Sequence, residues 1–152
     1  MSYPVQTPGA GAYLRTRILS ASSSELRLML FDGALRFIRA GRVELARERP
    51  DFEKLFESFA RAKKIVVELG SGLDRDRDPA LCDRMTGVCD FVYRLLVESN
   101  LERDVSKADQ ALELLTYERE TWALAVERAG NESASAGSAS ATAPSGPLSR
   151  SA

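Results

Sequence analysis

The sequence is dominated by four long segments in which apolar side chains recur every three or four residues, the period of an amphipathic helix. In the first segment, Leu26, Met29, Leu30, Phe37 and Ile38 fall on one stripe. No segment shows the sustained alternation of apolar and polar residues that is typical of a strand. Each segment is about 20 residues long, or about 30 Å as a helix. The connections between the last three are short, so the pattern predicts an all-α, antiparallel up-down four-helix bundle.

Local signals mark where the predicted helices begin. Ser22 and Glu25 have the spacing of a capping box, in which each side chain bonds to the backbone N–H of the other residue. Pro50 suits the first turn of the second helix. Asp78 followed by Pro79 is typical of the start of the third helix, with the aspartate as its N-cap.

Composition and cap signals divide the chain into three parts. We expect the third helix to end near Asn100, a residue that tolerates the left-handed conformation, and Asp104 to open the fourth. After Gly130 the chain is rich in Ser, Ala, Gly and Pro, and Leu148 is its one apolar side chain larger than Ala. Such a segment buries too little apolar surface to offset its ordering entropy. The predicted parts are an N-terminal cap segment, extended or a short helix, at 1–21, the bundle at 22–129 and a disordered tail at 130–152.

The composition argues against several functions. Lys and Arg number 21 against 22 Asp and Glu, which argues against nonspecific nucleic-acid binding as the main role. Histidine is absent, which excludes histidine metal sites and Ser-His or Cys-His nucleophile pairs. Helical phasing turns most of the available arginines toward solvent, so we expect neither an enzyme nor a bound cofactor or metal. Those arginines are Arg36, Arg39, Arg61 and Arg94.

The two cysteines, Cys82 and Cys89, lie seven residues apart on one predicted helix, about 10 Å from each other along its axis. A disulfide between them would break the helix, so we expect two buried thiols. The N-terminal segment lacks the apolar core of a signal peptide, and no run reaches the ~18 apolar residues of a membrane span. We therefore expect a cytoplasmic chain without membrane insertion.

Three stretches resemble the flagellin-specific export chaperones of bacterial flagella, the FliS family. "AYLRTRILSASSSEL" resembles the family's Ala-Tyr pair, spacer and Ser-Ala-Ser ahead of the first helix. "LMLFDGALRFI" resembles its Asp-Gly-Ala signature, and "CDFVYRLLVESNLERD" resembles the end of its third helix. Trp122 falls where the family ends its fourth helix with tryptophan. The resemblance spans roughly Ala12 to Val126.

This resemblance implies a function. Such a chaperone binds the C-terminal segment of flagellin in the cytoplasm, prevents premature polymerisation and delivers its cargo to the gate of the flagellar type III export apparatus. We expect a monomer or a weak homodimer. A helical adaptor for another amphipathic peptide, or a small bundle enzyme with an enclosed polar cavity, are the alternatives. The expected partner-binding residues are Tyr13, Ile18, Leu26, Leu30, Phe37, Leu95, Leu96 and Asn100.

The resemblance also accounts for Asp32 and Gly33, two residues that are unfavourable inside a helix. Gly33 lies on the inward stripe, where a missing side chain would let a neighbouring helix approach closely. Asp32 would anchor a loop or a helix start by hydrogen bonding, or else contact the partner directly. We therefore assign Asp32 and Gly33, together with Asp104 and Trp122, to a structural signature.

Overall fold

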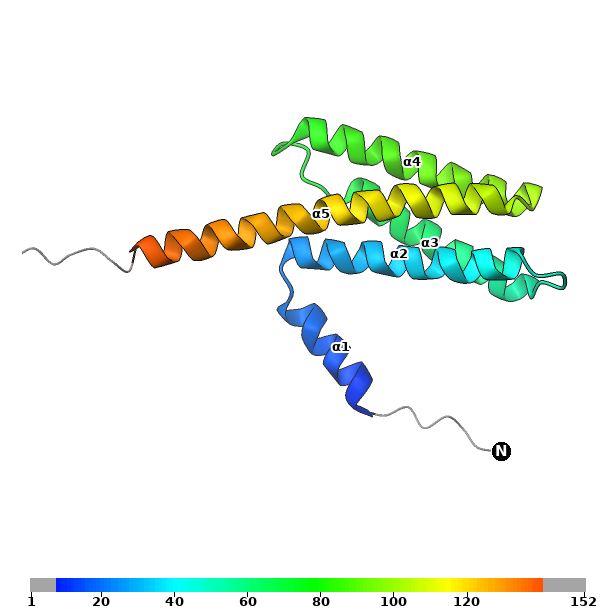
Figure 1. The fold of residues 1–152 in the computed structure, drawn as a ribbon, viewed down its shortest axis with the longest axis horizontal. Helices are drawn as coiled ribbons and strands as arrows, with labels where there is room; N and C mark the ends of the chain where they lie inside the picture. The colour runs from blue at the N-terminus through cyan, green and yellow to red at the C-terminus, as the bar shows by residue number, and fades with distance from the viewer. Residues whose placement is uncertain (1–7, 141–152) are drawn as a thin grey trace, which may run out of the picture.

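The computed structural model describes residues 8–140, which form five helices joined by short loops (Figure 1). The last four helices pack side by side in alternating directions around one core, so the predicted all-α up-down bundle is confirmed. Within the described residues, no helix is long and apolar enough to cross a membrane. The helices are α1 (Pro8–Ser20), α2 (Ser23–Leu45), α3 (Phe52–Ser71), α4 (Pro79–Glu102) and α5 (Val105–Ser140).

The predicted caps of α2 and α4 form as expected. The Glu25 N–H donates to Ser22 Oγ at 3.2 Å, and the Ser22 N–H donates to the Glu25 carboxylate at 3.3 Å. At α4, the Leu81 N–H donates to the Asp78 carboxylate at 3.0 Å. These bonds satisfy N–H groups that have no partner inside the helix.

The start of α3 differs from the prediction at Pro50. The helix begins at Phe52, and Asp51 is its N-cap, with its carboxylate accepting a hydrogen bond from the Lys54 N–H at 3.1 Å. A side-chain cap satisfies an unpaired N–H, whereas proline in the first turn only removes one. The cap therefore determines the boundary, and Pro50 lies before it.

The end of α4 also differs from the prediction. Asn100 remains helical, and Arg103 closes the helix in the left-handed conformation with φ 55°. This conformation costs roughly 1–2 kcal/mol for a residue with a Cβ. The guanidinium Cζ of Arg103 lies 4.5 Å from the centre of the Phe52 ring on α3, a cation–π contact that offsets part of the cost.

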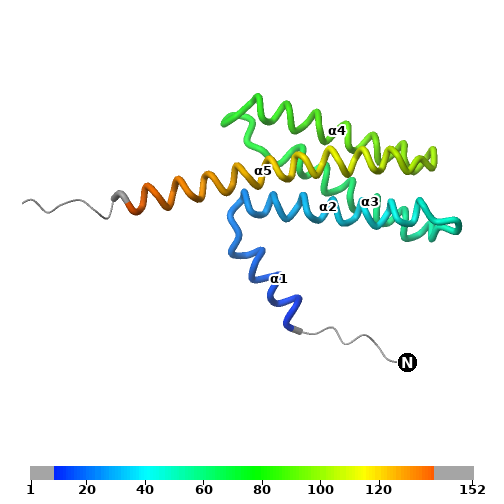
Figure 2. The backbone as a smooth tube through the Cα atoms, in the orientation of Figure 1, coloured from blue at the N-terminus to red at the C-terminus, as the bar shows by residue number. Residues whose placement is uncertain are grey.

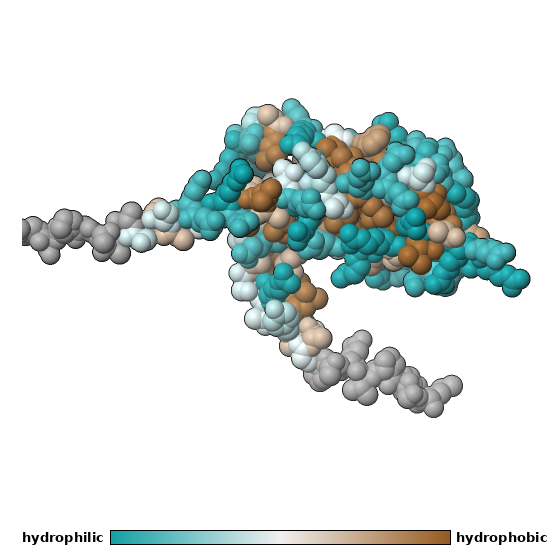
Figure 3. Space-filling model, viewed as in Figure 1, coloured by the Kyte–Doolittle hydropathy of each residue, from teal (hydrophilic) through white to brown (hydrophobic). Residues whose placement is uncertain are grey.

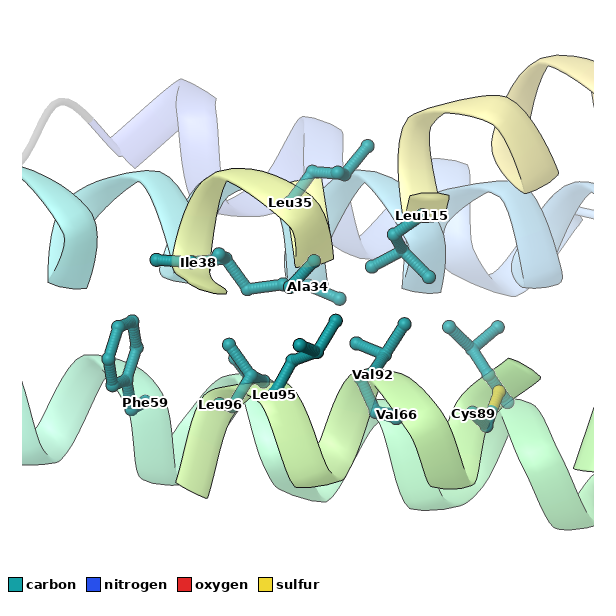
Figure 4. Close-up of a cluster of buried hydrophobic side chains, with 14 of the residues drawn as sticks. Ala34, Leu35, Ile38, Phe59, Val66, Cys89, Val92, Leu95, Leu96 and Leu115 are labelled. Atoms are coloured by element: carbon teal, nitrogen blue, oxygen red, sulfur yellow. The ribbon is translucent and has the colours of Figure 1, made fainter. Parts of the chain in front are cut away.

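Buried apolar side chains from all four bundle helices form one core, and Figure 4 shows them pointing toward one another. Both predicted buried thiols, Cys82 and Cys89, are buried and unpaired. Phe31, Leu55 and Leu69 belong to the same core. The labelled members in the figure are Ala34, Leu35, Ile38, Phe59, Val66, Cys89, Val92, Leu95, Leu96 and Leu115.

The two glycines inside α2 differ in how tightly they pack against α3. A Cβ atom at Gly33 would lie 3.4 Å from Ile65 Cδ1, an ordinary contact distance. A Cβ atom at Gly41 would overlap the ring of Phe59. The predicted close approach of helices therefore depends mainly on Gly41, which the sequence pattern did not single out.

The two ends of the described chain lie away from the core. α1 projects from the bundle at the start of α2, as the tube in Figure 2 shows. The short helix is one of the two predicted forms of the N-terminal segment, but it does not cover the bundle. α5 continues to Ser140, past the predicted boundary at 129, and residues 130–138 are exposed. Residues 141–152 of the predicted tail lie outside the described residues.

Candidate functional site

The two predicted partner-binding residues of α1 are open to solvent. Tyr13 is 71% exposed and Ile18 is 44% exposed, and Leu14 and Leu19 beside them are exposed as well. Figure 3 shows apolar side chains on this helix, which stands apart from the mainly polar surface of the bundle. α1 therefore presents apolar side chains that nothing in the described chain covers.

The predicted residues of α2 lie on its side that faces α3. Leu30 and Phe37 are half-buried and pack against the core from its edge. The Arg61 guanidinium of α3 lies 5.5 Å from the centre of the Phe37 ring. Leu26 is also half-buried and, with Leu30, lines an open groove at the start of the helix. The structure thus brings these three residues together on one partly exposed stripe.

The predicted residues of α4 are not on that stripe. Leu95 and Leu96 are buried in the core, on the helix that lies across the bundle from α2 (Figure 1). Asn100 is half-buried, and its Oδ1 atom has no hydrogen-bond partner in the part of the chain that is described. A partner would reach Leu95 or Leu96 only if the bundle opened.

The groove beside Leu26 has a volume of about 720 Å³. It lies at the end of the bundle where α2 begins, α3 ends and α4 begins, and α5 closes it with Trp122. Its walls are partly apolar and partly charged. The apolar side chains are Leu26, Leu30, Leu73, Leu81, Cys82 and Trp122, and the charged ones are Arg27, Glu68, Asp74, Arg77 and Asp78.

Arg27 is the residue of this groove that sequence reasoning missed. Its side chain is only 6% exposed, and burial lowers the pKa of its guanidinium. Nη2 donates to the carbonyl oxygen of Leu69 in the last turn of α3, a terminus without a basic residue of its own. Cζ lies 5.1 Å from the centre of the Trp122 ring. The sequence does contain one sign that Arg27 faces inward, because it lies four residues, about one helical turn, before the buried Phe31.

Three residues of the predicted structural signature form specific contacts. Trp122 Nε1 donates to the carbonyl oxygen of Ser24 at 3.0 Å and so joins α5 to the start of α2. The Asp32 carboxylate accepts a hydrogen bond from Arg119 Nε at 2.9 Å, inside α5 and not at the predicted loop or helix start. Asp104 opens α5 by accepting from the N–H of Ser106 at 2.9 Å and from its hydroxyl at 2.5 Å. The Ser106 hydroxyl bond is the main reason that the pKa of Asp104 is lowered.

Glu44 is a second buried charge that the sequence pattern did not reveal. Its carboxylate accepts a hydrogen bond from the Asp51 N–H at 3.1 Å and lies 3.3 Å from Arg47 and 3.8 Å from Lys54. These contacts hold the loop between α2 and α3. They lie at the opposite end of α2 from the groove, so Glu44 has a structural role.

The fold and the site together define a small helical-bundle protein with an open, partly apolar groove and an exposed apolar N-terminal helix. Within the described residues, no group of three or more acidic or cysteine side chains is arranged to hold a metal ion.

Comparison with known proteins identifies the family. The sequence model described as "Flagellar protein FliS" matches residues 6–129. The flagellar secretion chaperone FliS of Bacillus subtilis strain 168 is 31% identical over 116 residues, which cover 76% of this chain and 84% of that protein. The flagellar secretion chaperone FliS of Salmonella typhimurium strain LT2 is 28% identical over 110 residues, 72% of this chain and 80% of that protein. The chain belongs to the FliS family of flagellar secretion chaperones, which are not enzymes.

Proposed function

We propose that this chain is a cytoplasmic export chaperone that binds the C-terminal segment of flagellin. Bound in this way, flagellin cannot polymerise before export, and the chaperone delivers it to the gate of the flagellar type III export apparatus. The observation that carries the proposal is membership of the FliS family over residues 6–129. The named function of the two curated relatives, flagellar secretion chaperone, supports the same conclusion.

The surface of the chain is consistent with a peptide ligand. A segment that is unfolded when free gains most of its binding energy from apolar contact over a long path. Leu26, Leu30 and Phe37 offer such contact along α2. Tyr13 and Ile18 offer it on α1, where we assign them either to the cargo or to docking at the export gate.

Different segments of the chain have different roles. The bundle at 22–129 binds cargo, and the segment at 1–21 contributes to cargo binding or gate docking. We propose that Leu95, Leu96 and Asn100 take part only if cargo binding loosens the packing of α4. The chain acts as a monomer or a weak homodimer.

A polymerisation assay tests this function. Purified flagellin from the same organism is induced to polymerise, and light scattering is followed with and without the full chain. We expect an equimolar amount of the chain to suppress scattering. Flagellin that lacks its C-terminal segment should not bind the chain in a pull-down. Unchanged polymerisation in the presence of folded, equimolar chain would contradict the proposal.

A further inference from the structure

Arg27 is a buried cation without a carboxylate partner among the described residues. Its one hydrogen bond there is the bond from Nη2 to the Leu69 carbonyl, and its Nε atom has no partner. The face of Trp122 provides a cation–π contact, which is weaker than a counter-ion. A buried charge without a counter-ion is costly, and burial is the main cause of the lowered pKa of Arg27. The environment therefore favours an anion supplied by a ligand.

The N-terminus of α2 lies in the same groove and adds a second attraction for an anion. Ser23 and Ser24, which form the first turn of this helix, line the groove with Arg27. The capping box engages the N–H groups of Ser22 and Glu25, and no hydrogen bond within residues 8–140 engages those of Ser23 and Ser24. Free N–H groups at the positive end of a helix dipole favour a negatively charged ligand.

Acidic residues that line the same groove limit which anion fits. The Asp78 carboxylate caps α4, and the Asp74 carboxylate accepts a hydrogen bond from the N–H of Asp76. Glu68 and Arg77 complete the charged lining. These three carboxylates repel a doubly charged phosphate more strongly than a singly charged carboxylate. A single carboxylate on an apolar body fits better, on the side of the groove formed by Arg27, Trp122 and α2.

We propose that the groove is a subsite for the C-terminus of a peptide, with the terminal carboxylate against Arg27 and the first turn of α2. The proposal rests on the proposed function, because the peptide is the C-terminal segment of flagellin. Leu26 and Leu30 form the apolar wall, and Phe37 continues the stripe along α2 away from the groove. A peptide that lies along this stripe would place its C-terminal end beside Arg27. The volume of about 720 Å³ accommodates a few residues and not a continuing helix.

The test compares two synthetic peptides with the sequence of the flagellin C-terminal segment, one ending in a free acid and the other in an amide. Calorimetry on the full chain should show the acid binding about tenfold more tightly, the effect of a charge-assisted hydrogen bond. In Arg27→Gln the two peptides should bind equally. In Arg39→Gln, which changes an exposed arginine of α2 outside the groove, the preference for the acid should remain.

Each other outcome contradicts a specific part of the proposal. Equal binding of acid and amide by the unmodified chain would overturn the subsite and leave the chaperone function standing. If Arg27→Gln weakens the binding of both peptides equally, Arg27 binds an internal acidic side chain of the peptide. That result would overturn the assignment of Arg27 to the terminal carboxylate. If neither peptide binds the folded chain, the proposed function fails as well. The comparison on the unmodified chain decides the proposal even if Arg27→Gln does not fold.

Discussion

Replacing Gly41 by alanine should destabilise the bundle, whereas the same change at Gly33 should not. A Cβ atom at position 41 overlaps the ring of Phe59, which is buried and has little room to move. Overpacking of this kind costs up to about 3 kcal/mol, and alanine recovers about 1 kcal/mol of helix propensity. The expected net loss for Gly41→Ala is therefore about 2 kcal/mol. In Gly33→Ala the new Cβ atom lies 3.4 Å from Ile65 Cδ1 without overlap, so the higher helix propensity of alanine is not cancelled by overpacking.

Thermal unfolding followed by circular dichroism measures both variants on the same helix. At about 4 °C per kcal/mol for a domain of this size, Gly41→Ala should lower the Tm by about 8 °C. Gly33→Ala should leave the Tm unchanged or raise it slightly. The double variant Gly41→Ala with Phe59→Leu should lose less than the sum of the two single variants, because the smaller side chain makes room. A Tm for Gly41→Ala equal to or above that of the unmodified chain would contradict overpacking against Phe59.

Four further substitutions, one of them with Glu57→Ala as its control, test individual side chains. Gly33→Leu must displace Ile65 and should cost about 1–3 kcal/mol in urea unfolding; an unchanged midpoint would remove the packing role of Gly33. Glu44→Ala removes a buried carboxylate that accepts from the Asp51 N–H and should cost about 1–3 kcal/mol, while Glu57→Ala, at an exposed ion pair, should cost less than about 1 kcal/mol. Trp122→Phe loses the bond to Ser24 and should cost about 1 kcal/mol, with equal stability counting against that contact. Burial raises the pKa of the Cys89 thiol from 9.0 to about 11, so the stability that this thiol contributes is present below pH 9 and is lost as the pH rises toward 11. In Cys89→Ala, the free energy of unfolding should fall less steeply between pH 9 and about 11. An identical slope in the variant and the unmodified chain would contradict the raised pKa.

The helical segments and most of their caps were predictable because they depend on local chemistry. The Ser22 to Glu25 capping box and the Asp78 cap require only residues within one turn, and both form. The start of α3 was misplaced because two neighbouring signals, Pro50 and Asp51, compete, and the hydrogen-bonding cap determines the boundary. The end of α4 was misplaced because Arg103 gains a contact with Phe52, a residue of another helix.

The site was predictable only in part, because its key features depend on tertiary contacts. The stripe formed by Leu26, Leu30 and Phe37 follows from helical spacing. Spacing could not separate these edge positions from the fully buried Leu96. Arg27 shares the phase of the core, but an arginine is expected in solvent, and its acceptor at the end of α3 is visible only in the folded chain.

The same limit applies to the two glycines: the sequence pattern predicts the close helix approach at Gly33, whereas the structure has it at Gly41. Both glycines lie within α2, and both face α3. The sequence gives no sign of which one meets a large side chain. That difference arises because the Phe59 ring overlaps the Cβ position of Gly41, whereas the terminal methyl group of Ile65 only reaches contact distance from the Cβ position of Gly33.

The most direct test of the central claim is titration calorimetry of the full chain with a peptide from the C-terminus of flagellin of the same organism, at physiological salt and several temperatures. We expect binding near one to one with a negative heat-capacity change, because an unfolded segment buries apolar surface on the bundle. Absence of binding heat at every temperature, with circular dichroism showing the chain to be folded, would contradict it.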